Sequence, residues 1–508
     1  MVEGIVHFGY SEEIFHTLIL ESCSMISRTK IICTIGPATN TPEMLRKLLD
    51  AGMNVARLNF SHGTHESHGR TIDILKEIRE ERQAPLAIML DTKGPEIRLG
   101  QVESPIKVSP GERLTLTSKE ILGSKEAGVT LYPSCVFPYI QERAPILIDD
   151  GYIQAVVVTA QDNLVEIEFQ NSGEIKSNKS LSIKDIDIAL PFMTEKDIAD
   201  LKFGIEQDLD LIAASFVRCS EDIHSMRKIL ENFGQANMPI IAKIENHLGV
   251  QNFQEIAQAA DGIMIARGDL GIELSIVEVP GLQKFMARVS RETGRFCITA
   301  TQMLESMIRN PLPTRAEVSD VANAIYDGTS AVMLSGETAS GAHPAEAVKT
   351  MRSIIQETEK TFDYNALLQL NDKNSALKVS PYLEAIGFAG IQIAERAAAK
   401  AIIVYTQTGG SPMFLSKYRP YLPIIAVTPD RHVYYRLAVE WGVYPMLTLE
   451  SNRAVWRHQA CVYGVEKGIL SNYDKILVFS RGAGMQDTNN LTLTTVNDVL
   501  SPSFEGIS

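Results

Sequence analysis

The chain has 508 residues, of which 45% are hydrophobic and 22% charged, and its formal net charge at pH 7 is −14. This length exceeds what one hydrophobic core holds, so we expect two to four domains. The acidic balance argues against nucleic acid as a partner. No apolar run approaches the roughly 18 residues that span a bilayer, so a membrane protein is not expected either.

The first residues and the cysteines indicate a cytoplasmic protein. Residues 1–26 are expected to be an N-terminal extension, and its acidic residues Glu3, Glu12 and Glu13 replace the basic start of a signal peptide. The segment before Met25 is either a small appendage or a consequence of start-codon choice. The six cysteines stand far apart without zinc spacing, which indicates reduced thiols.

A short apolar run followed by an amphipathic helical stretch recurs along the first two thirds of the chain. Continuous apolar runs of this length are typical of parallel strands buried on both faces. Helical patterns such as Pro42–Ala51, Glu195–Gln207, Val250–Ala260 and Pro344–Lys360 lie between them. Eight such units predict an α/β fold, a TIM (β/α)₈ barrel. The expected strands are Lys30–Ile35, Val55–Phe60, Ala87–Leu90, Leu211–Phe216, Ile240–Ile244, Gly262–Ala266, Phe296–Ala300 and Ala331–Leu334.

One connection in this pattern is too long for a loop, since residues 95–191 separate the third strand from its helix. Alternating segments at Arg113–Thr117 and Gln154–Phe169 indicate strands within it. We expect a small inserted β-barrel domain on the carboxyl face of the barrel, where it would act as a lid. The catalytic barrel domain would then comprise residues 27–94 and 192–368.

A new strand and helix pattern begins after a polar linker at Asn371–Val379. The helical stretch Pro381–Ala399 precedes strands at Ala401–Tyr405, Ile424–Val427 and Lys475–Phe479. Residues 372–508 are therefore expected to form a separate C-terminal α/β domain.

Polar residues gather at the ends of six expected barrel strands, where barrel enzymes hold their catalytic groups. A single polar strand end is often a cap or a solvated loop, but six together indicate an active site. The six groups are Arg57, Asn59 and Ser61; Asp91 and Thr92; Lys243 and Glu245; Arg267, Gly268 and Asp269; Thr299, Thr301 and Gln302; and Ser335, Glu337 and Thr338.

These residue types favour phosphoryl chemistry with metal ions. Glu245 and Asp269 follow neighbouring strands, and two carboxylates without His or Cys suit Mg²⁺ or Mn²⁺. The alternative is a carboxylate that Lys243 alone neutralises. An ammonium beside a metal would stabilise charge on a transferring phosphoryl group, and Arg57 and Arg98 are further phosphate donors.

A second set of oxygen-bearing side chains suits a larger monovalent cation, since it offers one formal charge and several neutral oxygens: Asn59, Ser61, Asp91 and Thr92. Three histidines nearby have a spacing close to that of metal ligands, but no thiol or carboxylate completes a zinc set. We interpret them as capping and surface residues: His62, His65 and His68.

The strand-end segments closely resemble those of the pyruvate kinase family. The matching segments occur in the family's order along most of the chain, and the family's barrel, lid and C-terminal domain agree with the organisation above. The segments are Thr29–Ala38, Gly52–Thr64, Leu90–Arg98, Ile146–Gly151, Lys243–Gly249, Asp261–Glu273, Ala300–Arg315 and Leu334–Ala339.

The resemblance implies transfer of the phosphoryl group of phosphoenolpyruvate to ADP, giving pyruvate and ATP as the last step of glycolysis, with Mg²⁺ (or Mn²⁺) and K⁺. It also implies a homotetramer. Lys243 would stabilise the transition state beside Arg57 and Thr301. The remaining implied roles are substrate binding by Arg57, Lys243, Gly268, Asp269 and Thr301, Mg²⁺ binding by Glu245 and Asp269, K⁺ binding by Asn59, Ser61, Asp91 and Thr92, and nucleotide binding by Asn59, Arg98 and Lys179.

Position 96 bears on the K⁺ requirement. Glu96 matches the glutamate of the K⁺-dependent members, whereas members that work without K⁺ tend to carry a lysine there, so we predict K⁺ dependence. The proton donor to the enolate stays open between Thr301 with a water and the neighbourhood of Ser335 and Glu337.

The chain departs from the family's pattern in two places. Ser182-Ile-Lys-Asp185 replaces the Asn-Leu-Pro-Gly that often follows the lid lysine. Gln407 stands where some members have a lysine in the loop that binds an effector's phosphate, so the identity of an allosteric effector is open. The residues of that candidate effector loop are Thr406, Gln407, Thr408, Gly409 and Ser411.

Two other functions would share part of this pattern. Aldolases and carboxylating enzymes also handle pyruvate enolates on metal-binding barrels, but the monovalent-cation set, the long insert and the C-terminal domain argue against them. A non-catalytic relative would be expected to lose Lys243 or a metal carboxylate, and both are present.

Overall fold

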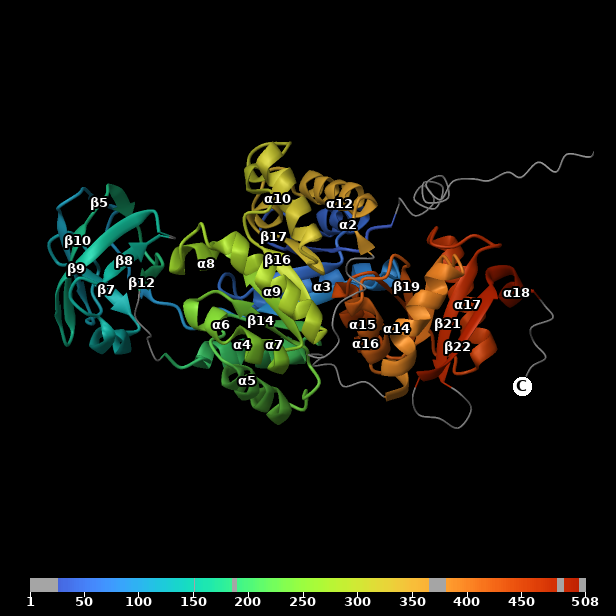
Figure 1. Ribbon diagram of the computed structural model, residues 1–508. Helices are drawn as coiled ribbons and strands as arrows, with labels where there is room; N and C mark the ends of the chain where they lie inside the picture. Colours follow the sequence, from blue (N-terminus) through green and yellow to red (C-terminus); the bar gives the residue numbers. More distant parts are fainter. Residues whose placement is uncertain (1–25, 150, 185–189, 365–380, 482–487, 502–508) are drawn as a thin grey trace, which may run out of the picture.

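The computed structural model describes residues 26–149, 151–184, 190–364, 381–481 and 488–501. The expected linker Asn371–Val379 and residues 1–25 of the N-terminal extension lie outside these ranges. The described chain forms three bodies in a row, with a β-rich insert at one end, a barrel in the middle and a C-terminal α/β body at the other end (Figure 1).

The central body is the expected barrel. Eight parallel strands close in the order β1-β17-β16-β15-β14-β13-β3-β2. Each expected strand is present, although the fourth ends at Ala214 because Phe216 adopts a positive φ of 56° that cannot continue a strand. The strands are β1 (Lys30–Thr34), β2 (Val55–Asn59), β3 (Ala87–Asp91), β13 (Leu211–Ala214), β14 (Ile240–Ile244), β15 (Gly262–Ala266), β16 (Phe296–Ala300) and β17 (Ala331–Leu334).

Helices surround the barrel, and several begin with capping boxes at Thr64, Thr194 and Thr314. The expected helix Val250–Ala260 is instead two helices that meet at Asn252, whose side chain donates to the Arg218 carbonyl. The helices are α2 (Pro42–Ala51), α3 (His65–Glu81), α4 (Glu195–Glu206), α5 (Ser220–Asn232), α6 (His247–Gln251), α7 (Phe253–Ala259), α8 (Arg267–Glu273), α9 (Val279–Thr293), α10 (Arg315–Tyr326), α11 (Gly336–Ala339) and α12 (Pro344–Lys360), with a short 3₁₀ turn, η2 (Glu305–Ile308).

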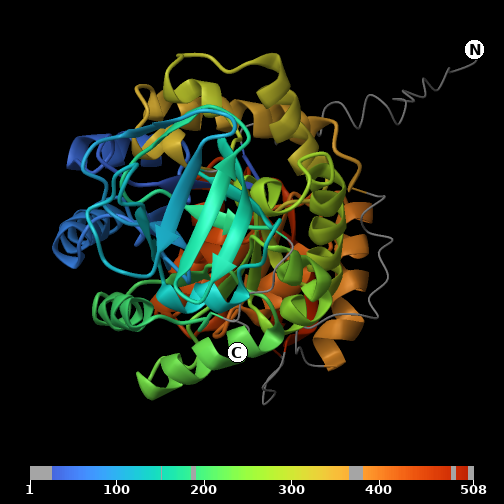
Figure 2. The ribbon, with the colours of Figure 1, turned by 90° about the vertical axis from the view of Figure 1, so that its left-hand side faces the viewer.

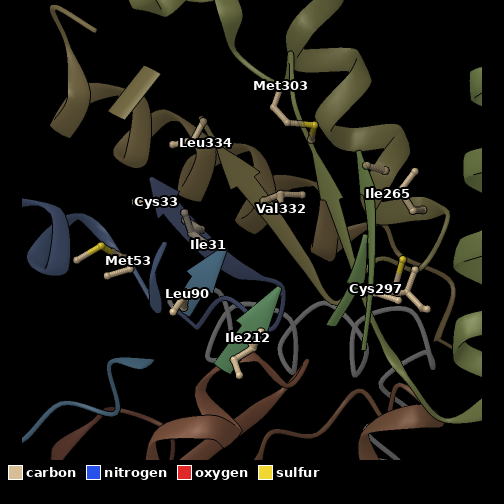
Figure 3. Packing of buried hydrophobic residues seen from close by; sticks show 14 of the residues in the cluster. Ile31, Cys33, Met53, Leu90, Ile212, Ile265, Cys297, Met303, Val332 and Leu334 are labelled. Atoms are coloured by element: carbon tan, nitrogen blue, oxygen red, sulfur yellow. The ribbon is translucent and has the colours of Figure 1, made fainter. Parts of the chain in front are cut away.

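Alternate residues of the barrel strands serve two cores. Ile31 and Cys33 of β1 join Leu90, Ile212 and other side chains that face the helices (Figure 3). Their neighbours point the other way, so Ile32 belongs to the cluster that fills the barrel interior. This alternation explains why the strands read as continuous apolar runs.

The insert is built from strands that leave the barrel after β3 and return before α4. Seven strands form a strongly curved sheet in the order β12-β8-β9-β10-β6-β7-β4, beside a two-stranded β11-β5 sheet. In Figure 2 this insert lies in front of one end of the barrel. Its elements are β4 (Arg98–Leu99), β5 (Ile106–Val108), β6 (Arg113–Thr117), β7 (Val129–Tyr132), η1 (Ser134–Tyr139), β8 (Pro145–Ile148), β9 (Ile153–Gln161), β10 (Leu164–Phe169), β11 (Gly173–Ile175) and β12 (Leu181–Ile183).

The C-terminal body has a five-stranded sheet in the order β20-β19-β18-β21-β22, with β22 antiparallel to its neighbour. Ala438 and Val439 join the barrel-interior cluster, so this body closes the end of the barrel away from the insert. The elements are α14 (Pro381–Arg396), β18 (Ala401–Tyr405), α15 (Gly410–Lys417), β19 (Ile424–Thr428), α16 (Arg431–Arg436), η4 (Leu437–Val439), β20 (Val443–Leu447), α17 (Arg453–Glu466), β21 (Lys475–Arg481), β22 (Thr488–Thr495) and α18 (Val496–Leu500).

Candidate active site

A buried network of charges occupies the carboxyl ends of β2, β3 and β14. Asp91 is fully buried, and its two oxygens accept from different cations: Arg57 Nε lies 2.5 Å from Oδ2 and Lys243 Nζ lies 2.9 Å from Oδ1. Burial alone would raise the pKa of Asp91, but the charges of Arg57 and Lys243 outweigh it and hold the pKa below its usual value. The carboxylate therefore stays ionised and fixes both cations.

Lys243 is held on several sides. Its ammonium lies 2.9 Å from Glu245 Oε1 and 2.7 Å from Ser215 Oγ, in addition to Asp91. Desolvation lowers the pKa of Lys243, but the charges of Asp91 and Glu245 overcome that effect and raise it. A lysine with three such contacts is a fixed, permanently charged donor, which is what stabilisation of a transferring phosphoryl group requires.

Ser215 also belongs to this network, although it was not among the residues predicted from the sequence. Its hydroxyl donates to the Thr92 carbonyl (2.6 Å), and its backbone N–H donates to the Thr92 hydroxyl (3.1 Å). The signal was available, because Ser215 lies at the end of the fourth expected strand, the same position that singled out the other candidates.

Glu245 and Asp269 line one cavity, as expected of two ligands for a divalent cation. Glu245 Oε2 accepts from the backbone N–H of Phe216 (2.6 Å), which fixes the carboxylate while Lys243 balances its charge. Within the described residues no cluster contains three His, Cys, Asp or Glu side chains able to hold a metal. The two carboxylates fit Mg²⁺, which commonly takes one or two protein carboxylates and fills its other positions with substrate oxygens and water.

The ends of β2 and β3 bring the monovalent-cation candidates together. Asn59 and Asp91 are direct neighbours in the register of the two strands. The Asn59 side-chain oxygen accepts from the Ser61 N–H (3.0 Å), so these two candidates are fixed to each other. The donor set contains one ionised carboxylate and neutral oxygens, which fits a hard cation of single charge.

Gly268 and Thr301 meet at the start of α8. The Gly268 N–H donates to Thr301 Oγ1 at 2.7 Å. Thr301 and the following Gln302 both have positive φ, 69° and 54°, a strained conformation that is concentrated at functional sites. The neighbouring Arg267 holds the Thr301 carbonyl at 2.8 Å and so keeps this turn in place.

The cavity between the insert and the barrel has a volume of about 500 Å³. Insert residues such as Glu96 and Ser182 form one wall, and barrel residues such as Glu245 and Asp269 form the other. The cavity therefore brings the insert next to the two carboxylates Glu245 and Asp269. Residues of this wall that the sequence did not single out include Arg218, Asn246 and His247.

The two nucleotide candidates of the insert are each paired with a carboxylate. Arg98 Nε lies 2.7 Å from Glu96 Oε2, and Lys179 Nζ lies 2.6 Å from Asp149 Oδ1. Both pairs are partly exposed, so the cations can exchange these partners for phosphate oxygens at modest cost.

The remaining candidates near the strand ends make local contacts. Glu337 is fully buried and accepts from the backbone N–H groups of Leu304 (3.0 Å) and Ser335 (2.7 Å), so it holds the loop after β16 against the end of β17. His65 Nε2 lies 2.7 Å from Asp200 Oδ1, and His68 Nε2 contacts the His62 carbonyl at 2.8 Å.

The candidate effector loop lies in the C-terminal body, at the opposite end of the molecule from the insert (Figure 1). Gly409 has a φ of 87° and donates its N–H to Thr406 Oγ1 at 2.9 Å. The Ser411 hydroxyl contacts that of Thr488 at 3.3 Å, and Gln407 and Thr408 are exposed. These polar residues therefore lie in a different body from the candidates at the barrel strand ends.

In the part of the chain that the structure describes, no helix combines the length and apolarity needed to cross a membrane. The barrel with paired cations and carboxylates at its carboxyl face defines an enzyme of the class that binds phosphorylated, anionic substrates.

Comparison with known proteins narrows this class. The family model described as pyruvate kinase, barrel domain matches residues 26–348, and the model described as pyruvate kinase, alpha/beta domain matches residues 384–493. A pyruvate kinase of Chlamydia trachomatis serovar L2 is 91% identical over 483 residues, which cover 95% of this chain and 100% of the relative. A pyruvate kinase from Geobacillus stearothermophilus is 44% identical over 476 residues, which cover 93% of this chain and 80% of the relative.

A solved structure gives the same result. The crystal structure of a pyruvate kinase from Cryptosporidium parvum matches with a TM-score of 0.86 at 36% identity, over 94% of this chain and 97% of that one. The chain belongs to the pyruvate kinase family. It is a phosphotransferase, as the sequence predicted, and the aldolase and non-catalytic alternatives are set aside.

Proposed function

We propose that the chain transfers the phosphoryl group of phosphoenolpyruvate to ADP in the cavity between the insert and the barrel, with Mg²⁺ and K⁺ as cofactors. The observation that carries this proposal is the ammonium of Lys243, fixed among Asp91, Ser215 and Glu245 beside the two cavity carboxylates. Such a preorganised cation is effective because it needs no rearrangement when charge develops.

Different residues of the barrel are proposed to bind the substrate and the metal ions. Arg57, Lys243, Gly268, Asp269 and Thr301 are proposed to contact phosphoenolpyruvate. Glu245 and Asp269 would hold Mg²⁺ or Mn²⁺, and Asn59, Ser61, Asp91 and Thr92 would hold K⁺. When bound, these cations supply positive charge and Lewis acidity at the phosphoryl oxygens.

The nucleotide approaches from the insert side. Asn59, Arg98 and Lys179 are proposed to bind its phosphates, with Arg98 and Lys179 leaving Glu96 and Asp149 for phosphate oxygens. Closure of the insert would exclude water from the reacting groups and so prevent hydrolysis.

After transfer, the enolate must take a proton on carbon. We propose Thr301 as the residue nearest this step, since its turn is strained and its hydroxyl is aligned by Gly268. The Ser335 hydroxyl is the second candidate, because it is buried without a hydrogen-bond partner among the described residues. Glu337 instead has both oxygens engaged by backbone N–H groups, which favours a structural role.

We further propose four segments of the chain, a binding loop for an effector and a homotetrameric assembly. The proposed bounds are 1–26 for the N-terminal extension, 27–94 and 192–368 for the barrel, 95–191 for the lid and 372–508 for the effector domain. The loop from Thr406 to Ser411 would receive a phosphorylated effector at the start of α15. By analogy with the family, a homotetramer in the cytoplasm is expected, and the described cysteines are all free, which suits a reducing compartment.

The test is pyruvate formation from phosphoenolpyruvate and Mg²⁺, with and without ADP, in K⁺ buffer and in buffer balanced with tetramethylammonium. The proposal expects pyruvate to form only with ADP and mainly with K⁺. Pyruvate that forms equally well without ADP would contradict phosphoryl transfer, and equal rates in both buffers would contradict the K⁺ site. Omitting Mg²⁺ should abolish the reaction.

A further inference from the structure

Helix α4 begins where the chain re-enters the barrel after the insert, and its first two turns contact both loops that carry the proposed K⁺ ligands. The first loop, as we use the term, begins at the last residue of β2 and contains Asn59 and Ser61. The second begins at the last residue of β3 and contains Asp91 and Thr92. The helix is far from both loops in sequence, so the contacts are a product of the tertiary fold.

Lys196 holds the first loop. Its ammonium donates to the carbonyl of Phe60 at 2.9 Å, and Phe60 lies between Asn59 and Ser61. The same ammonium lies 2.5 Å from Asp200 Oδ2, while Asp200 Oδ1 contacts His65 at 2.7 Å. Asp200 is buried and orients Lys196, so the peptide between the two proposed ligands is fixed by a charge-assisted hydrogen bond.

Asp197 holds the second loop. It is fully buried, and its Oδ1 accepts from the Gly94 N–H at 3.0 Å, two residues after Thr92. Its Oδ2 accepts from the Thr194 N–H and hydroxyl, so the same carboxylate caps α4. Gly94 has a φ of 70°, and a Cβ there would lie 2.8 Å from the Phe216 ring. The backbone of this loop therefore has little freedom.

We infer that Lys196 and Asp197 are positioning residues for the monovalent cation. Both lie in the same turn of α4, each holds one of the two ligand-bearing loops, and together they fix the distance between these loops. This inference rests on the proposed K⁺ site. Groups that orient metal ligands without touching the metal typically change affinity by about 10–100-fold when mutated. Because α4 follows the return from the insert directly, the same turn connects the insert to the cation loops.

A purely structural role of Lys196 has to be separated from a role in K⁺ binding. The Lys196 side chain is 51% exposed, but that of its partner Asp200 is only 1% exposed, so loss of the ammonium leaves a buried carboxylate paired with His65 and should lower stability. Methionine has a helix propensity similar to that of lysine. Replacement of Lys196 by methionine should thus lower the melting temperature without K⁺ and, in addition, weaken K⁺ binding, so the change that K⁺ causes within each variant is the quantity that separates the two roles.

The experiment compares Lys196→Met with Lys202→Met in the full chain. Lys202 lies on the same helix and forms an exposed pair with Glu206 at 3.9 Å, so it controls for loss of a lysine from α4. Two quantities are measured for each variant: the K⁺ concentration for half-maximal pyruvate formation, and the rise in melting temperature caused by KCl relative to tetramethylammonium chloride at equal ionic strength.

We expect the half-saturating K⁺ concentration of Lys196→Met to rise about tenfold and its K⁺-dependent thermal shift to shrink, with Lys202→Met like the parent and Lys196→Arg in between. An unchanged or lowered K⁺ requirement in Lys196→Met, or an equal change in Lys202→Met, would overturn the inference. If the parent itself shows no response to K⁺ in either measurement, the proposed K⁺ site fails and the inference falls with it.

Discussion

Replacing Lys243 by methionine tests the centre of the proposed mechanism. The substitution keeps a long side chain but removes the ammonium that contacts Asp91, Ser215 and Glu245. Removing a single preorganised donor to developing charge commonly lowers kcat by about 10²–10³. Because this ammonium is also the fixed charge beside both cavity carboxylates, we expect a loss of at least about 10³.

The same change should cost stability, because it leaves two buried carboxylates with fewer partners. Removing one member of a buried ion pair costs about 3–5 kcal/mol. Arg57 still pairs with Asp91, and the Phe216 N–H still donates to Glu245, so we expect the lower end, about 3 kcal/mol. The fold should remain intact.

The loss of stability should depend on pH in a defined direction. The pKa of Asp91 lies below its usual value of 3.8 in the folded protein, because the charges of Arg57 and Lys243 outweigh burial. A lowered pKa contributes stability that is present above 3.8 and is lost as the pH falls through the folded pKa. The gap in melting temperature between parent and variant should therefore be largest near neutral pH and narrow in acid.

The assay follows pyruvate release at saturating phosphoenolpyruvate, ADP, Mg²⁺ and K⁺, with thermal melting by circular dichroism on the same samples. Lys228→Met is the control, since Lys228 is exposed on α5. A kcat of Lys243→Met within tenfold of the parent value would refute the role assigned to this ammonium. A lowered kcat accompanied by loss of the folded circular dichroism spectrum would instead show a structural defect.

Two further substitutions test other parts of the molecule. Glu96→Lys should reduce the need for K⁺, and it also removes the carboxylate that pairs with Arg98 at 2.7 Å. A K⁺ requirement equal to that of the parent would show that position 96 does not set it. Glu440→Gln should flatten the dependence of melting temperature on pH between 4.5 and about 7. The reason is that burial raises the pKa of Glu440 to about 7, although the charges of Arg419 and other nearby cations oppose this rise. A raised pKa gives stability that is complete below 4.5 and is lost as the pH rises through 7, so an equally sloped profile in the variant would contradict the assignment.

The strongest sequence predictions concern residues whose position follows from a local pattern. Lys243 lies on β14 and Glu245 directly follows that strand, two residues later, so the extended backbone predicts that both side chains lie on one face. The parallel arrangement then places the ends of neighbouring strands side by side, as with Asn59 and Asp91. These regularities made the barrel and the composition of the candidate site predictable.

Predictions were weaker where a local pattern is interrupted by a contact from elsewhere. The strand expected to reach Phe216 ends early, because Phe216 turns to donate its N–H to Glu245. The helix expected over 250–260 is divided at Asn252, which contacts the carbonyl of Arg218. Neither interruption has a signal in hydrophobic periodicity, because both depend on a hydrogen bond to a distant segment.

The sequence alone determined the eight barrel strands, the long insert, the C-terminal body and the family resemblance. These features follow from hydrophobic periodicity and from the polar residues at strand ends, which are properties of residues close together in the chain. Only the tertiary structure decided how the site is held. Asp91 pairs with Lys243 across 152 positions, and Lys196 reaches Phe60 across 136. Such partners are set by closure of the barrel and by the return of the chain from the insert, which bring together segments that no local pattern connects.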